Sequence, residues 1–258
     1  MEKEKTFISL TSYAPRFPNL SITLESILDQ ASLVDGVTLW IFHEEIKTLK
    51  KYLSSNLSKY IEINACSQLY SYKKILPLMA RNSSINIITA DDDTTYPDGW
   101  LQSLLDWHFE HPREVVAHRV HHIKTTTDGD LLPYNQWVRC IKEPCVPSPL
   151  NFQTGLGGVF YPAGVLSTEV FNVKRILRIC PFADDIWLYF MARINGRYIV
   201  PTGIDIDLSP HPGSQSVALW KKNIGENGND IVLKQLAGIY GRVWLDELKR
   251  KEGRNGVD

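Results

Sequence analysis

The sequence has almost no net charge and no long apolar run. Lys and Arg total 28 against 29 Asp and Glu, so the formal charge is -1 and no global field draws the chain to nucleic acid or to an anionic membrane. No apolar run approaches the about 18 residues of a membrane span, and Met1-Glu2-Lys3-Glu4-Lys5 lacks the order of a signal peptide. These absences predict a cytoplasmic protein with no nucleic-acid partner.

Cysteine is also scarce, and the cysteines present form no metal-binding pattern. The four residues are scattered without a CxxC pair, at Cys66, Cys140, Cys145 and Cys180. We therefore expect buried free thiols rather than disulfides or zinc ligands. A Walker A loop is absent too, which argues against P-loop chemistry.

The chain alternates short apolar, β-branched runs with helical patterns. Its 258 residues are 43% hydrophobic, enough for one sizeable core. Strands are predicted at 6–11, 37–42, 61–65, 85–90 and 115–123, and helices at 18–33, 44–53, 72–81, 168–179 and 184–195. This order predicts an α/β fold with a mostly parallel central sheet flanked by helices. We expect a single domain over 1–258, with a nucleotide-binding half (1–112) and an acceptor-binding half (113–258).

Three adjacent carboxylates, Asp91, Asp92 and Asp93, directly follow the apolar run 85–90. Ligands of such sheets bind beyond the carboxyl ends of the strands, and a divalent cation would relieve the repulsion among these charges. On an extended chain Asp91 and Asp93 share a face, which suits Mg²⁺ or Mn²⁺. The ordinary alternative is that the triplet only ends the strand and caps the next helix.

Several segments together resemble bacterial glycosyltransferases of the GT-A fold, especially the family-2-like enzymes of surface polysaccharide (capsule, O-antigen or lipooligosaccharide) biosynthesis. The segments are SLTSYAPRF at 9–17, YKKILP at 72–77, TADDDTTYPDGWLQSLL at 89–105, GGVFYPAGVL at 157–166 and PFADDIWL at 181–188. The resemblance implies transfer of a sugar, with inversion, from a nucleotide-diphosphate donor such as a UDP-sugar to a saccharide or lipid-linked saccharide acceptor.

The resemblance also implies roles for particular residues. Asp93 would bind the metal, Asp91 would lie toward the ribose, and His211 would complete the metal shell. Asp185 would be the general base and Asp184 its companion, although the family usually has Glu-Asp there, so the choice between the two stays open. The residues that bind the donor or the acceptor would be Thr11, Ser12, Tyr13, Arg16, Lys74, Asp91, Asp92, Arg119, Gly157, Gly158 and Trp187, with the two glycines on the acceptor side. By their own chemistry, Arg16 can reach a phosphate and Trp187 can stack on a sugar face.

Each of these positions also has an ordinary structural explanation. Asp184 and Asp185 begin an apolar helix, whose N-terminus should lower their pKa. Lys73 and Lys74 are a solvent-facing pair in the ordinary case. The run 117–122 contains three histidines without further ligands at metal spacing, which favours a structural or acceptor-side role over zinc.

Two other functions remain open. A metal-dependent sugar nucleotidyltransferase also uses paired aspartates at strand ends, and a carbohydrate-binding protein could retain the same fold without catalysis. A weakly basic C-terminal helix, with Trp244, Leu245 and residues 248–251, suggests peripheral contact with the inner face of the plasma membrane.

Overall fold

The computed structural model describes residues 4–206, 209–211 and 228–245. Its core is a seven-stranded sheet in the order β10-β6-β9-β4-β1-β2-β3. The strands are β1 (Thr6–Thr11), β2 (Gly36–Phe42), β3 (Ile61–Cys66), β4 (Asn86–Ala90), β6 (Val115–Ala117), β9 (Val159–Tyr161) and β10 (Ile199–Pro201). Within this sheet the strand pairs are parallel except those of β9, which runs opposite to both β4 and β6. The predicted α/β class with a mostly parallel sheet is therefore confirmed.

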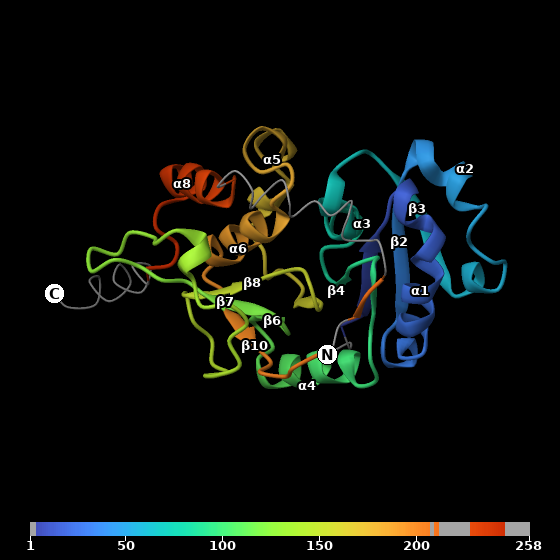
Figure 1. Ribbon diagram of the computed structural model, residues 1–258, viewed down its shortest axis with the longest axis horizontal. Coiled ribbons are helices and arrows are strands. Elements are labelled where there is room, and N and C mark those ends of the chain that lie inside the picture. Colours follow the sequence, from blue (N-terminus) through green and yellow to red (C-terminus); the bar gives the residue numbers. More distant parts are fainter. Residues whose placement is uncertain (1–3, 207–208, 212–227, 246–258) are drawn as a thin grey trace.

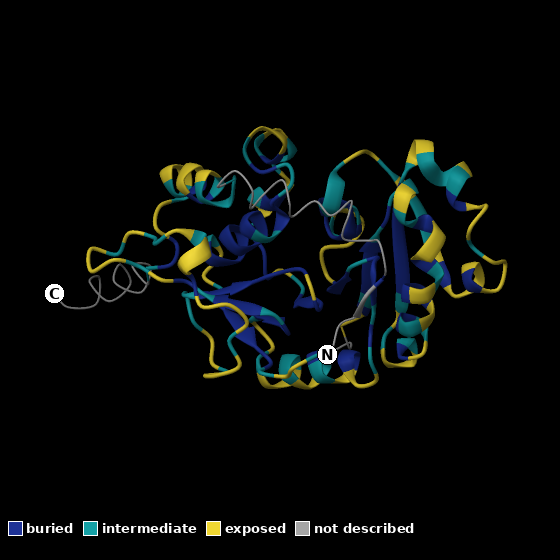
Figure 2. Ribbon diagram, in the orientation of Figure 1, coloured by how far each residue is buried: buried dark blue, intermediate teal, exposed yellow. Residues whose placement is uncertain are grey.

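Helices cover both faces of this sheet (Figure 1). One face carries α1 (Leu20–Leu28), α2 (Ile46–Leu49) and α4 (Trp100–Glu110), and the other carries α3 (Leu76–Arg81) and α6 (Asp184–Ile194). Beyond α6, α8 (Gly228–Tyr240) packs against α6 and α5 (Val173–Ile179). Neighbouring residues of one strand face opposite cores: Ile88 packs in the cluster with α1 and α4, whereas Ile87 packs in the cluster with α3 and α6. Coverage of both faces explains why the strands are apolar throughout, and Figure 2 shows them buried.

Two small antiparallel sheets complete the fold. β5 (Thr94–Thr95) pairs with β11 (Ser209–Pro210), and β7 (Val120–His122) pairs with β8 (Asn151–Gln153). The first pair joins the chain just after the Asp triplet to the segment that carries His211. Among the described residues, no helix is both long enough and apolar enough to cross a bilayer.

Four expectations from the sequence need correction here. The run 115–123 is not one strand, because β6 and β7 belong to different sheets. The predicted helix 44–53 is reduced to α2, and the region 70–81 is a 3-10 helix followed by α3. The cysteines are free, as predicted, but Cys140 is exposed and only Cys180 is buried.

The C-terminal membrane contact also loses part of its basis. Trp244 is buried and donates its indole N–H to Gly129 O over 2.9 Å, so its ring does not face outward. Residues 248–251 lie outside the described part of the chain.

Candidate active site

A cavity of about 720 Å³ opens where the carboxyl ends of β1 and β4 face the start of α6. These two strands are neighbours, and β1 connects onward to β2 on its other side, so the cavity lies at a switch point of the strand order. Its walls include Thr11, Ser12, Tyr13, Arg16, Lys73, Lys74, Asp91, Asp92, Asp93, Arg119, His121, Tyr134, Arg139, Phe152, Thr154, Gly155, Phe182, Asp184, Asp185 and Asn229. Both halves of the chain thus contribute to one cavity.

The end of β1 forms the first wall. The Thr11 hydroxyl donates to Trp40 O over 2.7 Å, which fixes this end of the strand against β2. Lys73 reaches the same loop and donates to Ser12 O over 3.4 Å. Burial lowers the pKa of Lys73 despite the neighbouring Cys66 and Glu45. Lys73 and Lys74 are both buried, so the solvent-facing alternative for this pair is wrong.

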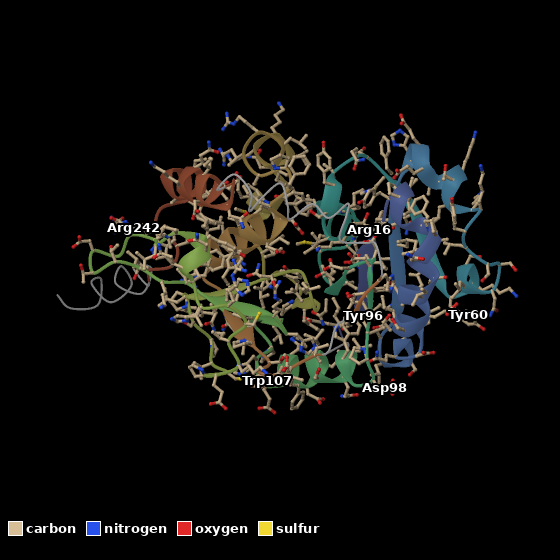
Figure 3. All side chains as sticks on the ribbon, in the orientation of Figure 1. Arg16, Tyr60, Tyr96, Asp98, Trp107 and Arg242 are labelled. Carbon is tan, nitrogen blue, oxygen red and sulfur yellow. The ribbon has the colours of Figure 1, made fainter. Side chains whose placement is uncertain are left out.

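The Asp triplet does not have the arrangement expected for an extended chain. The backbone bends after β4, and the Arg16 guanidinium bridges Asp92 and Asp93, with 3.0 Å from Nη2 to Asp93 Oδ2. Arg16, predicted to reach a phosphate, is therefore paired with these carboxylates in this structure; Figure 3 labels it to the right of centre. Burial raises the pKa of Asp92, and the Arg16 charge opposes that rise.

Asp91 points the other way, toward Lys74. Lys74 Nζ lies 3.2 Å from Asp91 Oδ1 and 3.3 Å from Asp184 Oδ2. One buried ammonium thus joins two acidic motifs that are far apart in the sequence. Burial alone would lower the pKa of Lys74, but the carboxylates of Asp184, Asp91 and Asp185 raise it well above its ordinary value. Lys74 is therefore a fixed positive charge at the centre of the cavity.

The two acids of α6 have different surroundings. Asp184 accepts a hydrogen bond from Ser71 Oγ over 2.8 Å and also pairs with Lys74. For Asp185, burial and then the Asp184 charge raise the pKa to about 7, although Lys74 opposes both. The sequence predicted a lowered pKa from the helix N-terminus. That expectation is wrong for Asp185, because burial and the adjacent like charge outweigh the helix dipole.

Gly155 lies at the point where these groups converge, and the sequence did not single it out. A Cβ at this position would lie 2.8 Å from Lys74 Nζ and 3.1 Å from Asp185 Oδ1. The predicted glycines, Gly157 and Gly158, are displaced from the cavity. They pass over the Trp100 indole, which donates to Gly157 O over 2.6 Å and lies 2.8 Å from a Cβ built at Gly158. The glycine-rich segment predicted from the sequence lies close along the chain to Gly155, which lines the cavity. Gly157 and Gly158 themselves pack against Trp100.

The expected metal ligands are not gathered into a ready site. Within 4–206, 209–211 and 228–245, no group of three or more His, Cys, Asp or Glu side chains could hold a metal ion. His211 does lie beside the triplet, because its backbone N–H donates to Asp93 O over 2.9 Å. Its Nδ1 and Asp92 Oδ2 are buried and find no hydrogen-bond partner among the described residues. Carboxylate oxygens and an imidazole suit Mg²⁺ or Mn²⁺, so the donors fit a cation once Arg16 withdraws.

Two further predicted residues have clear positions. Trp187 is fully buried and donates its indole N–H to Val170 O over 3.2 Å, so the prediction that it stacks on a sugar is wrong. Arg119 lines the cavity and donates to Cys140 Sγ and Thr154 Oγ1.

His118, from the histidine-containing run 117–122, has a structural role, because its ring lies 2.8 Å from Thr202 Oγ1 and 3.1 Å from Trp100 O.

Comparisons with known proteins give only distant likenesses. No protein-family model and no curated protein match the chain. Among solved structures, a synthetase of CMP-2-keto-3-deoxy-manno-octonic acid complexed with CTP is 12% identical, with a TM-score of 0.45, over 77% of this chain and 89% of that one. A putative glucose-1-phosphate thymidylyltransferase from Bacillus anthracis is 12% identical, with a TM-score of 0.46, over 88% and 99%. A 4-diphosphocytidyl-2C-methyl-D-erythritol synthase is 13% identical, with a TM-score of 0.39, over 63% and 76%. At these TM-scores the likeness carries no argument about function.

Proposed function

We propose that this protein is a metal-dependent glycosyltransferase that moves a sugar from a nucleotide-diphosphate donor, a UDP-sugar in the first instance, to a saccharide acceptor. The observation that carries the proposal is the single cavity in which Lys74 joins Asp91 to Asp184, with Asp185 beside them. Asp185 has a pKa of about 7. A carboxylate with that pKa is matched to accept a proton from a hydroxyl near neutral pH.

In this proposal, the chain's own residues act on both the acceptor and the donor. On the acceptor side, Asp185 accepts the proton of the acceptor hydroxyl while the oxygen of that hydroxyl bonds to the anomeric carbon of the donor. The bond from the anomeric carbon to the diphosphate breaks, and its electron pair stays on the phosphate oxygen. A Mg²⁺ or Mn²⁺ ion would be held by Asp93, Asp92 and His211 rather than by Asp91, which pairs with Lys74. It would supply charge neutralisation of the leaving diphosphate. Lys74 keeps Asp91 and Asp184 paired, which fixes the positions of both acidic motifs.

The environments of the two α6 acids favour Asp185 as the base. Asp184 already accepts from Ser71 and pairs with Lys74, so it positions the lysine. Asp185 carries the raised pKa, because burial and the Asp184 charge outweigh the attraction of Lys74, whose ion pairs are with Asp91 and Asp184. The role of Asp184 in this proposal is therefore that of a positioning residue.

The second candidate is a metal-dependent sugar nucleotidyltransferase. The part of the cavity lined by residues within 119–154 forms its second wall. Two arginines on this wall, Arg119 and Arg139, suit a substrate that carries a phosphate. A sugar phosphate nucleophile is already ionised and needs no general base, however. The raised pKa of Asp185 therefore favours transfer to a hydroxyl.

Product analysis distinguishes the candidates. The protein is incubated with UDP-sugars and Mn²⁺ in one arm, and with nucleoside triphosphates and sugar 1-phosphates in the other. A glycosyltransferase releases nucleoside diphosphate, whereas a nucleotidyltransferase releases pyrophosphate. We expect Asp185→Asn to reduce the release of nucleoside diphosphate by about 10²–10⁴-fold. The matched control is Asp205→Asn, since that side chain is 82% exposed in an ion pair with Lys142.

Unchanged turnover in Asp185→Asn would refute the assignment of the base. Pyrophosphate release would replace the first candidate with the second. A protein that binds saccharides and releases neither product would be the non-catalytic binding protein that the sequence left open.

A further inference from the structure

The second wall of the cavity carries two arginines that the proposed chemistry does not use. Arg119 lies between β6 and β7 and is half-buried, while Arg139 lies on the exposed loop after Trp137. Among the ion pairs of the described residues, neither guanidinium meets a carboxylate. Arg119 instead donates to neutral groups, at 3.4 Å to Cys140 Sγ and 3.5 Å to Thr154 Oγ1. Two positive charges therefore face one cavity without neutralisation from this part of the chain.

His121 lines the cavity near both arginines, and it neither cancels nor adds to their charge. Its Nδ1 accepts the backbone N–H of Cys140 over 3.2 Å, which requires an unprotonated nitrogen. Burial, and then the charges of Arg119 and Arg139, lower the pKa of His121 to about 4. A neutral imidazole leaves the positive field of the two guanidiniums intact.

The backbone around Arg139 is held in an unusual conformation. Cys140 is not a glycine, yet its φ is 53°, in the left-handed region that such residues rarely adopt. The contacts of Cys140 with His121 and Arg119 hold this turn against the cavity wall. Strain of this kind persists where surrounding contacts fix it, and it concentrates at ligand sites.

Tyr134 lines the same cavity as the two arginines and Asp185. Its ring packs edge-on against Phe152 at 5.9 Å between centroids. Burial raises its pKa, the Asp185 charge adds to that rise, and the charges of Arg119 and Arg139 oppose it. Tyr134 therefore interacts electrostatically with Asp185 and with both arginines.

We propose that Arg119 and Arg139 form a subsite for an anionic group, a phosphate or a carboxylate, carried by the second substrate. Guanidinium groups recognise both anions through paired N–H donors. An anion anchored there would hold the rest of a saccharide in the same cavity, with a hydroxyl directed toward Asp185. The inference rests on the proposed function for its description of that saccharide as the acceptor, but the anion site itself requires neither a nucleotide nor a metal.

Direct binding tests the subsite with pairs of probes that differ in one group. Titration calorimetry compares glucose 6-phosphate with glucose, and methyl glucuronide with methyl glucoside, for the full chain without nucleotide or metal. We expect both anionic probes to bind at least about tenfold more tightly than their neutral partners, and Arg119→Gln and Arg139→Gln each to remove about tenfold or more of that affinity. The ratio between the two anionic probes identifies phosphate or carboxylate as the preferred group.

Three further variants show where the probes bind. Arg119→Lys keeps the charge without the paired donors, so we expect partial recovery. Arg178→Gln, on the exposed surface of α5, is the matched control and should leave probe binding unchanged. Loss of probe binding in Arg16→Gln but not in Arg119→Gln or Arg139→Gln would move the anion to the first wall and overturn the proposal.

Two other results would also overturn it: equal affinity for anionic and neutral probes, or unchanged affinity in both Arg119→Gln and Arg139→Gln. Because Arg139 is exposed, its variant remains informative if Arg119→Gln does not fold. The proposed function fails separately, if UDP with Mn²⁺ neither binds nor raises the melting temperature. That measurement concerns the first wall and involves neither arginine.

Discussion

Gly155 has no side chain at the point where Lys74, Asp185 and Asp91 come closest. A Cβ there would lie 2.8 Å from Lys74 Nζ, closer than real Cβ atoms approach a neighbour, so the lysine would have to move. We expect Gly155→Ala to lower kcat by about 10- to 100-fold, because small displacements of catalytic groups cost rate at this scale. The measurement is the rate of nucleoside diphosphate release.

The matched control for this variant is Gly238→Ala. Gly238 lies in α8 with nothing within 4 Å of an added Cβ, so alanine there should raise stability by up to about 1 kcal/mol and leave kcat unchanged. Full activity in Gly155→Ala would show that the site tolerates displacement of Lys74, contrary to the geometry.

Arg16 is the present counter-ion of Asp92 and Asp93. Its side chain is 14% exposed and those of the two aspartates are 6% and 12% exposed, so their charges are poorly screened. We expect Arg16→Gln to lower the melting temperature in the presence of a chelator and to regain more stability than the parent when Mn²⁺ is added without nucleotide. A ligand that binds only the folded state must stabilise it.

Arg81→Gln is the control for that experiment. It removes an ion pair with Glu62 whose side chains are 48% and 55% exposed, which is worth at most about 1 kcal/mol. Its Mn²⁺ response should equal that of the parent. If Mn²⁺ stabilises Arg16→Gln no more than the parent, Arg16 does not compete with a cation for these carboxylates.

At the scale of elements, α6 is anchored by its buried face. Trp187 donates to Val170 O in the 3-10 helix Thr168–Phe171, and its ring meets Tyr240 of α8 at 6.1 Å between centroids. We expect Trp187→Ala to lower the free energy of unfolding by about 3–5 kcal/mol, as for other buried aromatic truncations. The KM for the donor should not change in the protein that remains folded.

Denaturant unfolding and initial-rate kinetics measure the two effects of Trp187→Ala. Tyr60→Ala is the control, because Tyr60 is 67% exposed (Figure 3) and its loss should change stability by no more than about 0.5 kcal/mol. A raised KM with unchanged stability would restore the sugar-stacking role that the structure contradicts.

The elements of the first half were largely predictable from sequence. Continuous β-branched runs such as Ile85 to Ala90 can only be strands covered on both faces, and the observed β4 matches that run within one residue. The split of 115–123 into β6 and β7 was not predictable. Both pieces are apolar, and only the pairing of β7 with β8, a long-range contact, shows where the chain leaves the central sheet.

The site was predictable as a set of segments rather than as contacts. The acidic motifs at Asp91–Asp93 and Asp184–Asp185 and the lysine of 72–77 do line one cavity. Which glycine meets the lysine, and which carboxylate meets Arg16, depend on a bend after β4 and on side-chain direction. A single backbone bend and the direction of a side chain produce no periodic pattern in the sequence. For this reason Gly155 was missed, and Trp187 was assigned to a ligand instead of the core.

At the scale of the whole molecule, two buried histidines, His118 and His121, and the half-buried Asp185 make the stability depend on pH. Burial and the Asp184 charge raise the pKa of Asp185 from 3.8 to about 7. Burial lowers the pKa of His118 from 6.5 to about 4, and that of His121 to about 4 with help from the two arginines. Between pH 4 and 6.5 the folded state therefore holds a proton on Asp185 that the unfolded state lacks, and it lacks two that the unfolded histidines hold.

The signs of these contributions can be added. Each histidine contributes stability that is present above the unfolded pKa of 6.5 and lost as the pH falls toward 4, whereas Asp185 contributes stability that is lost as the pH rises from 3.8 toward 7. In this window the unfolded state holds two protons on the histidines and the folded state holds one on Asp185, so the unfolded state binds one proton more. These groups therefore make the free energy of unfolding rise with pH by about 1.4 kcal/mol per unit.

Asp185→Asn removes the opposing contribution, so its slope should be steeper than that of the parent by about 1.4 kcal/mol per pH unit. The variant should also be more stable than the parent above pH 7, where the parent holds a half-buried, ionised Asp185. Urea unfolding of both proteins from pH 4.5 to 8 measures these differences. Parallel curves would mean that Asp185 titrates alike in the folded and unfolded states. The carboxyl would then lack the raised pKa on which its role as a base near neutral pH depends.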